Sequence, residues 1–337
     1  MTTFADLTTL RVGGNAPQLV VATSEEDIIE ACQSDDLLVI GGGSNLLVSD
    51  NGFAGHVLKI ATSGQKIESD ACSGATVTLA AGEQWSSFVD YAVSHALAGV
   101  ETLAGIPGLV GAAPIQNIGA YGSDISESIA QVRTYDRKLK TISTFAAADC
   151  GFGYRTSRFK SESDRWIVLD VTLQLRSGTE SNPIKYQELA DVLSVEIGQR
   201  APIEQVREAV LELRKKKGML LDANDHDTWS AGSFFTNPIV ESSVAEKLPT
   251  TAPRWPVENG MKISAAWLIE QAGFSKGDRL GGAAISSKHS LALTNASNAT
   301  ADDLIALASK IRNQVHLKFG IWLEPEVRLV GMALEQN

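Results

Sequence analysis

The sequence predicts a globular protein that mixes α-helices and β-strands in two to three domains. The chain has 337 residues, of which 44% are apolar and 20% charged, and domains average roughly 150 residues. Short apolar runs such as residues 37–40 are typical of strands, whereas longer stretches with apolar residues three and four positions apart are typical of helices. Both patterns recur along the chain, so we expect an α+β protein.

Composition and missing motifs exclude several classes of function. The chain carries 29 Lys and Arg against 40 Asp and Glu, and this net charge of −11 disfavours nucleic acids and anionic membranes as partners. Cys32, Cys72 and Cys150 form no CxxC pair and the five histidines show no paired spacing, so we expect neither disulfides nor a metal site. The chain lacks a Walker-type loop, HExxH and GxSxG. No apolar run suits a signal peptide or membrane span, so we expect a cytoplasmic protein.

The first 60 residues predict strands around one helix. Residues 19–21 and 37–40 are apolar runs that predict strands, and residues 25–32 have helical spacing with Ser24 as N-cap. The second strand leads into GGGSN at residues 41–45, and residues 46–60 predict a strand, a turn and a strand. A dinucleotide-binding GxGxxG loop opens a helix, so this loop is of another type. Taken alone, the glycines form either a tight turn, which is the commoner case, or a phosphate cradle.

Residues 99–122 form the most unusual segment, after a predicted strand at 77–81 and an amphipathic helix at 85–97. The segment holds six glycines and a single charged residue, Glu101. Surface loops are normally polar, so this composition predicts backbone buried against a flat, partly polar partner. An unusually packed core loop is the alternative, but together with residues 41–45 we favour an aromatic cofactor. Strands are predicted at 129–135 and 166–176.

The last third predicts two long helices and a final strand. Pro202 begins a helix that Gly218 ends, and Arg214 to Lys217 lie at its C-terminal turn, either solvated or clamping a phosphorylated ligand. A helix over residues 263–271 and strands near 281–294 precede a helix that Thr300 caps and Gly320 ends. Residues 321–331 predict a strand, in which Glu324 and Glu326 lie on one face, or an edge strand with both acids in solvent.

Five segments in this order resemble the motifs of UDP-N-acetylenolpyruvoylglucosamine reductases: GGGSN, IPGLVGAAPIQNIGAYG, FGYRTSRF, AGSFFTNP and EPEVR. The resemblance covers essentially the whole chain. It implies a cytoplasmic, monomeric flavoenzyme that reduces UDP-N-acetylglucosamine enolpyruvate to UDP-N-acetylmuramate with NADPH through FAD, in peptidoglycan synthesis. Tyr186, in IKYQEL, implies the subtype with a tyrosine-bearing loop.

The resemblance also implies a division into domains. The fold class is α+β, with a vanillyl-alcohol-oxidase-like two-part FAD-binding fold and a C-terminal α+β substrate-binding domain. Residues 1–62, joined by 321–337, form the first FAD-binding subdomain and residues 63–212 the second. Residues 213–320 form the substrate-binding domain.

Site residues follow from the matching motifs. Three residues fall on catalytic positions, with Arg155 and Glu326 as activating residues and Ser233 as proton donor. The positions that bind FAD are Gly41, Gly42, Gly43, Ser44, Asn45, Ile106, Pro107, Gly108, Gly111, Asn117, Gly119, Ala120, Tyr121, Gly122 and Arg214. The substrate positions are Tyr186, Lys217, Asn237 and His289, although Lys215 and Lys216 compete with Lys217, and His289 replaces a glutamine of one subtype.

The implied reaction explains these residue types. Hydride adds to an alkene conjugated with a carboxylate, and an arginine is suited to the negative charge that builds there, because its charged fork binds carboxylates through two hydrogen bonds. A glutamic acid beside a carboxylate is sensible if burial and the like charge keep it protonated. The carbon next to the carboxylate then takes a proton from a positioned hydroxyl.

Two other functions use the same glycine loops. One is an oxidase or other FAD-dependent oxidoreductase of the same fold, which needs neither the AGSFF serine nor the EPE acid. The other is a flavoprotein that binds a nucleotide sugar without turnover.

Overall fold

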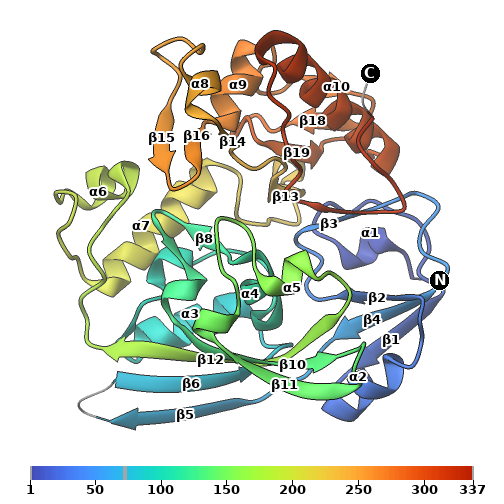
Figure 1. The fold of residues 1–337 in the computed structure, drawn as a ribbon, viewed down its shortest axis with the longest axis vertical. Helices are drawn as coiled ribbons and strands as arrows, with labels where there is room; N and C mark the ends of the chain where they lie inside the picture. Colours follow the sequence, from blue (N-terminus) through green and yellow to red (C-terminus); the bar gives the residue numbers. More distant parts are fainter. Residues whose placement is uncertain (1, 71–73, 336–337) are drawn as a thin grey trace. The chain divides into compact units, whose positions relative to one another are not determined.

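The computed structural model describes residues 2–70 and 74–335 (Figure 1). The chain divides into two compact units, each with its own hydrophobic core. Unit 1 comprises Met1–Pro17, Gly43–Ala54 and Lys217–Asn337, and unit 2 comprises Gln18–Gly42 and Gly55–Lys216. No helix within the described residues combines the length and the apolar character that a membrane span requires. The three predicted domains, with their boundaries at residues 62, 212 and 320, stay a prediction.

Unit 2 contains a parallel sheet and a larger antiparallel sheet. The parallel sheet has the order β1-β4-β2, and the antiparallel sheet the order β11-β10-β12-β6-β5, with β7 beside β12. A two-stranded ribbon pairs β8 with β9. The strands are β1 (Gln18–Ala22), β2 (Leu37–Ile40), β4 (His56–Ile60), β5 (Gln65–Asp70), β6 (Gly74–Ala80), β7 (Leu97–Ala98), β8 (Gly119–Ala120), β9 (Ser123–Asp124), β10 (Ile129–Asp136), β11 (Thr141–Ala146) and β12 (Trp166–Ser177).

Helices of unit 2 cover the large sheet and supply its core. Figure 1 shows α3 on one face of this sheet, where Trp85, Phe88 and Val89 are buried with Val77 and Leu79 of β6. The helices are α2 (Glu25–Ala31), α3 (Trp85–Ser94), α4 (Ala113–Gln116), α5 (Arg158–Ser161), α6 (Gln187–Leu193) and α7 (Ile203–Lys216), with 3₁₀ turns at Glu101–Leu103, Val110–Ala112, Ile125–Glu127 and Ala147–Asp149.

Unit 1 packs the long helix α10 against a four-stranded antiparallel sheet of order β13-β19-β18-β17. A second sheet has the order β14-β16-β15, and β20 pairs in parallel with β3. The strands are β3 (Leu46–Val48), β13 (Ser230–Ser233), β14 (Ile239–Val240), β15 (Arg254–Val257), β16 (Gly260–Ile263), β17 (Arg279–Leu280), β18 (Ala283–Ile285), β19 (Ala292–Asn295) and β20 (Arg328–Val330). The helices are α1 (Phe4–Leu7), α8 (Ser242–Ala245), α9 (Ala265–Gln271) and α10 (Ala301–Phe319), with a 3₁₀ turn at His226–Thr228.

The predicted helix boundaries are confirmed where a cap fixes them. The Ser24 hydroxyl accepts a hydrogen bond from the Asp27 N–H at the start of α2, and Thr300 accepts one from Asp303 at the start of α10. Gly218 and Gly320 follow α7 and α10 with φ of 66° and 68°, a conformation that glycine adopts without strain.

Three boundaries were predicted wrongly. The helix predicted over 85–97 ends at Ser94, and Leu97 begins strand β7. Residue 263 ends strand β16, and the helix starts at Ala265 because the Ser264 hydroxyl accepts the Trp267 N–H. The strand predicted over 321–331 is regular only from Arg328 to Val330. Pro325, which has no N–H, leaves a single bridge to Phe235 in the preceding residues. Glu324 and Glu326 therefore do not lie in one continuous strand.

Two cysteines, Cys32 and Cys150, are buried free thiols. Burial raises the pKa of each thiol to about 11, so both are neutral and unreactive at physiological pH. The third cysteine of the sequence, Cys72, lies outside the described residues.

A buried carboxylate fixes the turn between β10 and β11. The Asp136 side chain is 0% exposed, and it accepts hydrogen bonds from the Lys138 and Leu139 N–H groups and from the Arg165 guanidinium. The Arg165 hydrogen bonds hold the pKa of the Asp136 carboxyl below its usual range.

Replacing this carboxylate tests its contribution to stability. Asp136→Asn is expected to lower the free energy of unfolding by about 2 kcal/mol at neutral pH, because Arg165 loses a buried charged partner. The native pKa lies below the unfolded value, so the stabilisation is present above about pH 4 and is lost as the pH falls through the native pKa. Urea unfolding at neutral and acidic pH measures this difference.

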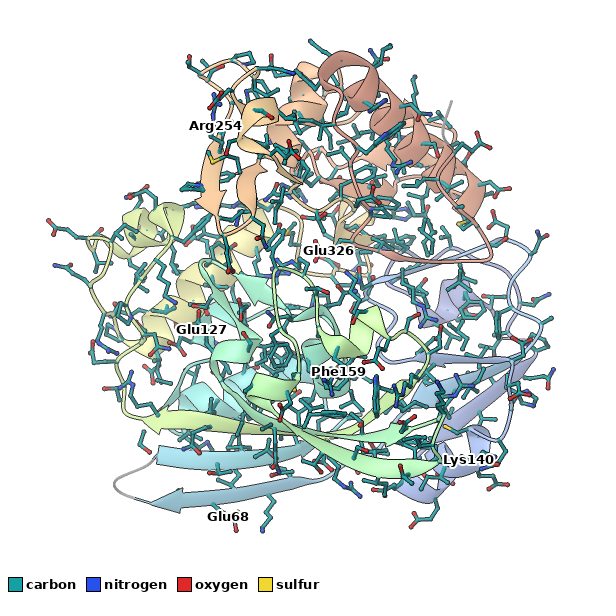
Figure 2. The ribbon with its side chains drawn as sticks, in the orientation of Figure 1. Glu68, Glu127, Lys140, Phe159, Arg254 and Glu326 are labelled. Atoms are coloured by element: carbon teal, nitrogen blue, oxygen red, sulfur yellow. The ribbon has the colours of Figure 1, made fainter. Side chains whose placement is uncertain are left out.

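The control is Glu68→Gln on the outer strand β5, whose carboxylate pairs with Lys66 in solvent (Figure 2). It is expected to change stability by less than about 0.5 kcal/mol. An equal loss in both variants, or a loss for Asp136→Asn that does not shrink in acid, would contradict the assignment.

Candidate active site

Two glycine-rich loops meet within unit 2. Gly41 and Gly42 follow β2, and the chain opens no helix there, which confirms that this is not a dinucleotide-binding GxGxxG loop. A Cβ built on Gly42 would lie 3.0 Å from the Gly108 Cα, and one on Gly111 would lie 2.5 Å from the Ala81 Cβ. Gly111 therefore needs glycine, and a methyl group on Gly42 would require the Gly108 backbone to shift by a few tenths of an ångström.

The second loop is buried along almost its full length, as the sequence predicted. Residues 99–121 are all buried or half-buried, and Gly122 is exposed. Neighbouring groups satisfy the backbone: the Gly111 N–H donates to the Ala81 carbonyl (2.9 Å), and the Trp85 indole N–H donates to the Leu103 carbonyl (3.0 Å). The half-buried part, residues 105–108 with Ile106 and Pro107, presents an apolar surface next to the glycine contact.

Arg155 is held in a strained conformation against this loop. Its φ of 52° is unusual for a residue with a long side chain, and such strain concentrates at functional sites. Its guanidinium donates to the Gly119 carbonyl (2.6 Å) and approaches the Asn117 carbonyl (3.5 Å). The Asn117 amide in turn donates to the Gly153 carbonyl (3.0 Å), so the two segments fix each other.

Lys160 supports the strained arginine and was missed by the sequence analysis. Its ammonium group donates to the Arg155 carbonyl (2.9 Å) and to the Gln116 side chain (3.0 Å). It follows Arg155 by five residues, and nothing in the sequence distinguishes it from a solvated surface lysine.

Arg214 is a buried cation in the same unit. Burial, opposed by Tyr121 and assisted by nearby Arg155, lowers the pKa of its guanidinium to about 10. Arg214 is therefore charged at neutral pH. Burial also raises the pKa of the Tyr121 phenol to about 12. The ring of Tyr186 lies edge-on to Tyr121 with centroids 5.6 Å apart, which brings four predicted site residues together.

Unit 1 brings together three predicted residues that are far apart in the sequence. The Glu326 N–H donates to the Phe234 carbonyl (2.8 Å), next to Ser233 at the end of β13. The Ser233 hydroxyl lies 3.5 Å from the His289 Nε2. Ser233, His289 and Glu326 are half-buried, whereas Phe234 and Phe235 are buried beneath them in the core. Figure 2 marks Glu326 in the segment that precedes β20.

Other predicted residues of unit 1 have visible structural partners. Gly43 adopts a φ of 62°, and a Cβ there would lie 1.9 Å from the Leu7 carbonyl oxygen, so only glycine fits. Ser44 is half-buried beside it, and the Asn45 amide donates to the Glu326 carbonyl (3.1 Å). The Asn237 side chain accepts the Ala265 N–H (2.9 Å) at the start of α9.

The four cationic residues at the end of α7, Arg214 to Lys217, differ in how exposed they are to solvent. Lys215 and Lys216 are exposed, and Lys216 pairs with Glu212 at 2.7 Å. These two match the expectation for solvated cations at a helix end. Arg214 is buried and Lys217 is half-buried, so these two differ from the solvated pair and are the candidates for contact with a ligand.

These features fit FAD. Close backbone approach at Gly42, a half-buried apolar surface at residues 105–108 and a buried guanidinium suit a large, flat ligand with phosphates and an electron-rich ring.

Comparisons with known proteins agree with this geometry. The family described as "FAD binding domain" matches residues 16–142, and "UDP-N-acetylenolpyruvoylglucosamine reductase, C-terminal domain" matches residues 224–330. The chain is 50% identical over 339 residues to the UDP-N-acetylenolpyruvoylglucosamine reductase of Cutibacterium acnes, covering 98% of this chain and 89% of the relative. It is 49% identical over 347 residues to that of Streptomyces coelicolor, with the same coverage. The crystal structure of the reductase from Thermus caldophilus aligns with a TM-score of 0.69 at 26% identity, covering 98% and 97% of the two chains.

Fold and site together define an FAD-dependent oxidoreductase, and the predicted fold class is confirmed: α+β, with the two-part FAD-binding fold and a C-terminal substrate-binding domain. Within this class, the chain belongs to the UDP-N-acetylenolpyruvoylglucosamine reductase family. It is an NADPH-dependent flavoenzyme that reduces UDP-N-acetylglucosamine enolpyruvate to UDP-N-acetylmuramate for peptidoglycan synthesis. The alternatives of an oxidase and of a flavoprotein without turnover are set aside.

The glycine contact can be tested with neighbouring substitutions. Gly42→Ala is expected to lower several-fold the FAD that copurifies with the protein, because its Cβ would press on the Gly108 Cα at 3.0 Å. Gly41→Ala is the control, since its Cβ would meet Leu109 at 3.4 Å, an ordinary contact. The ratio of flavin to protein absorbance measures both. Equal flavin contents in the two variants would show that the contact does not matter for the cofactor.

Proposed function

We propose that Arg155, Ser233 and Glu326 carry the chemical step of this reduction. The observation that supports it most is in unit 1, where backbone pairing sets Glu326 beside Ser233 although 93 residues separate them in the sequence. A proton donor and a group that contacts a carboxylate must lie close together to act on one enolpyruvyl group, in which the carboxylate is bonded to the carbon that takes the proton.

Arg155 binds the substrate carboxylate, where negative charge builds during hydride addition. Its hydrogen bonds to carbonyl oxygens orient the guanidinium without cancelling its charge. A preorganised cation in a place with little water stabilises such charge strongly. Glu326 donates a hydrogen bond from its protonated carboxyl group to the same carboxylate.

Ser233 protonates the carbon next to the carboxylate. Its position at the end of β13 is fixed on both sides, by the pairing with Ala292 of β19 and by the buried Phe234 that follows it. A fixed hydroxyl can deliver a proton to one face of the substrate only.

FAD, when bound, receives hydride from NADPH and supplies it to the alkene. We assign its binding to residues 41–45, residues 106–108, Gly111, Asn117, residues 119–122 and Arg214. Tyr186, Lys217 and Asn237 bind the diphosphate ligands. We prefer Lys217 to Lys215 and Lys216 because it alone of the three is half-buried.

We further propose that the enzyme works as a monomer in the cytoplasm. Both family domains match this one chain. The free thiols of Cys32 and Cys150 suit a reducing compartment.

The role of Ser233 predicts a separation of the two half-reactions. Ser233→Ala is expected to reduce its flavin with NADPH at a near-normal rate, because that step needs no serine proton. Oxidation of the reduced flavin by the enolpyruvyl sugar is expected to slow by roughly 10²- to 10⁴-fold. Ser233→Cys recovers part of the rate, since a thiol also donates a proton. Stopped-flow absorbance measures both steps, with Ser230→Ala in the same strand as control. Equal slowing of both half-reactions would reject Ser233 as the donor.

The proposed role of Arg155 predicts that a positive charge alone at this position is not sufficient for fast oxidation of the flavin. Arg155→Lys is expected to lower the rate of flavin oxidation at saturating enolpyruvyl sugar by about 10²-fold, because an ammonium group cannot form the bidentate fork. Arg158→Lys is the matched control in the same motif, where the guanidinium lies over Phe145 and beside Glu162. Normal oxidation in Arg155→Lys would return Arg155 to a structural role.

A further inference from the structure

A serine hydroxyl is a weak acid, so proton donation by Ser233 needs help from a neighbour. Unless another group supplies a proton or stabilises the oxygen as the proton leaves, the step generates an alkoxide in a site with little water. The structure offers one ionisable side chain within reach of this oxygen among the contacts of the described residues. The His289 Nε2 lies 3.5 Å from the Ser233 Oγ, a long contact of the kind that tightens when substrate binds.

Strand pairing fixes Ser233 relative to the turn that carries His289. Ser233 pairs with Ala292 in the β13–β19 register, and the Phe234 N–H donates to the Leu291 carbonyl (2.7 Å). His289 is three residues before this pair, and its carbonyl accepts the Ala292 N–H (3.1 Å). The histidine backbone is thus held by the same strand that holds the serine.

The turn between β18 and β19 is itself tied down by hydrogen bonds. The buried Ser286 hydroxyl accepts the N–H groups of Lys288 (3.0 Å) and His289 (3.3 Å). Ser287 donates to the Asp227 carboxylate through its N–H and its hydroxyl, both at 2.9 Å, and the Lys288 ammonium lies 2.6 Å from the Asp225 carboxylate. A turn held at three successive residues is more than a hairpin connection requires, and it keeps the imidazole next to the hydroxyl.

We propose that His289 relays a proton to Ser233 during the protonation of substrate. It is a positioning residue in that it acts through Ser233 and not on the substrate itself. The inference rests on the proposed role of Ser233 as the donor, and it assigns to this chain's histidine a task that a glutamine at the same place could not perform.

Every proton that the relay delivers is replaced within one turnover. As the O–H bond of Ser233 breaks and a C–H bond forms on the substrate, the proton on the His289 Nε2 passes to the Ser233 Oγ. The ring, which carries a proton on each nitrogen before the step, keeps its Nδ1 proton and becomes neutral. Its Nε2 regains a proton from solvent once the product has left, so one turnover takes one hydride and one solvent proton, and both side chains end as they began. The half-buried position of His289 leaves the ring a route to water.

Four variants test the relay: His289→Ala, His289→Gln, Ser233→Ala and the double variant of Ser233→Ala with His289→Ala. The rate of flavin oxidation is measured by stopped flow over a range of enolpyruvyl sugar concentrations. His289→Ala is expected to lower the saturating rate by about 10²-fold and to leave the half-saturating concentration unchanged. His289→Gln keeps a hydrogen-bond donor but carries no transferable proton, and it is expected to be as slow as His289→Ala. The double variant is expected to be no slower than Ser233→Ala, since the relay acts only through the serine.

Imidazole added to the solution supplies a readout that a purely structural role does not produce. It is expected to raise the rate of His289→Ala several-fold in proportion to its concentration and to leave Ser233→Ala unchanged. His95→Ala, which removes an exposed imidazole at the end of α3, is the control and is expected to match the unaltered protein with and without added imidazole.

The outcomes separate the two proposals. If Ser233→Ala oxidises its flavin normally, the proposed function of Ser233 fails and the relay fails with it. If Ser233→Ala is slow but His289→Ala has a normal saturating rate, only the relay is overturned. It is also overturned if His289→Gln restores the rate, because a hydrogen bond then suffices, or if His289→Ala changes only the half-saturating concentration, because His289 then binds substrate.

Discussion

The close approach of two glycine backbones is the constraint on which the cofactor side of the enzyme depends. Gly42 lies at the end of a parallel strand, and Gly108 lies in the long loop that follows α3. A side chain on Gly42 would press on the Gly108 Cα and push the loop away from the end of the parallel strand. The apolar residues 105–108 can therefore stay half-buried rather than collapse into the core, which is what a flat ligand needs.

The arginines of unit 2 differ in the groups that they contact. Arg133 and Arg165 point at carboxylates of Glu25, Asp170 and Asp136, so those ion pairs add stability and little net potential. Arg155 donates hydrogen bonds to two carbonyl oxygens, and Arg214 is buried within its electrostatic reach. An acidic chain can thus place two guanidinium groups close together, a local feature that net charge cannot reveal.

Local signals explain what could be predicted from the sequence. Ser24 and Thr300 mark helix starts by their own hydrogen bonds, and the composition of residues 99–122 indicates burial regardless of fold. The elements that could not be predicted depend on tertiary contacts. Strands β5 and β11 and the β14-β16-β15 sheet lack a clear alternation of apolar and polar residues. The position of Pro325 opposite Phe235 depends on a segment 90 residues away in the sequence. The motifs pointed to Ser233 and to His289 separately, but the short distance between the two side chains becomes visible only through the register of β13 with β19.

A serine that donates to carbon sets a demand that differs from the more familiar serine nucleophile. A nucleophile needs a base to remove its proton, whereas a donor needs a source to replace it, and an imidazole serves either purpose according to the direction of transfer. Asp225 and Asp227 bind Lys288 and Ser287 in the turn that carries the histidine. The proposed direction follows from the substrate: hydride addition leaves a carbon that must gain a proton, so in the proposed relay the histidine supplies one.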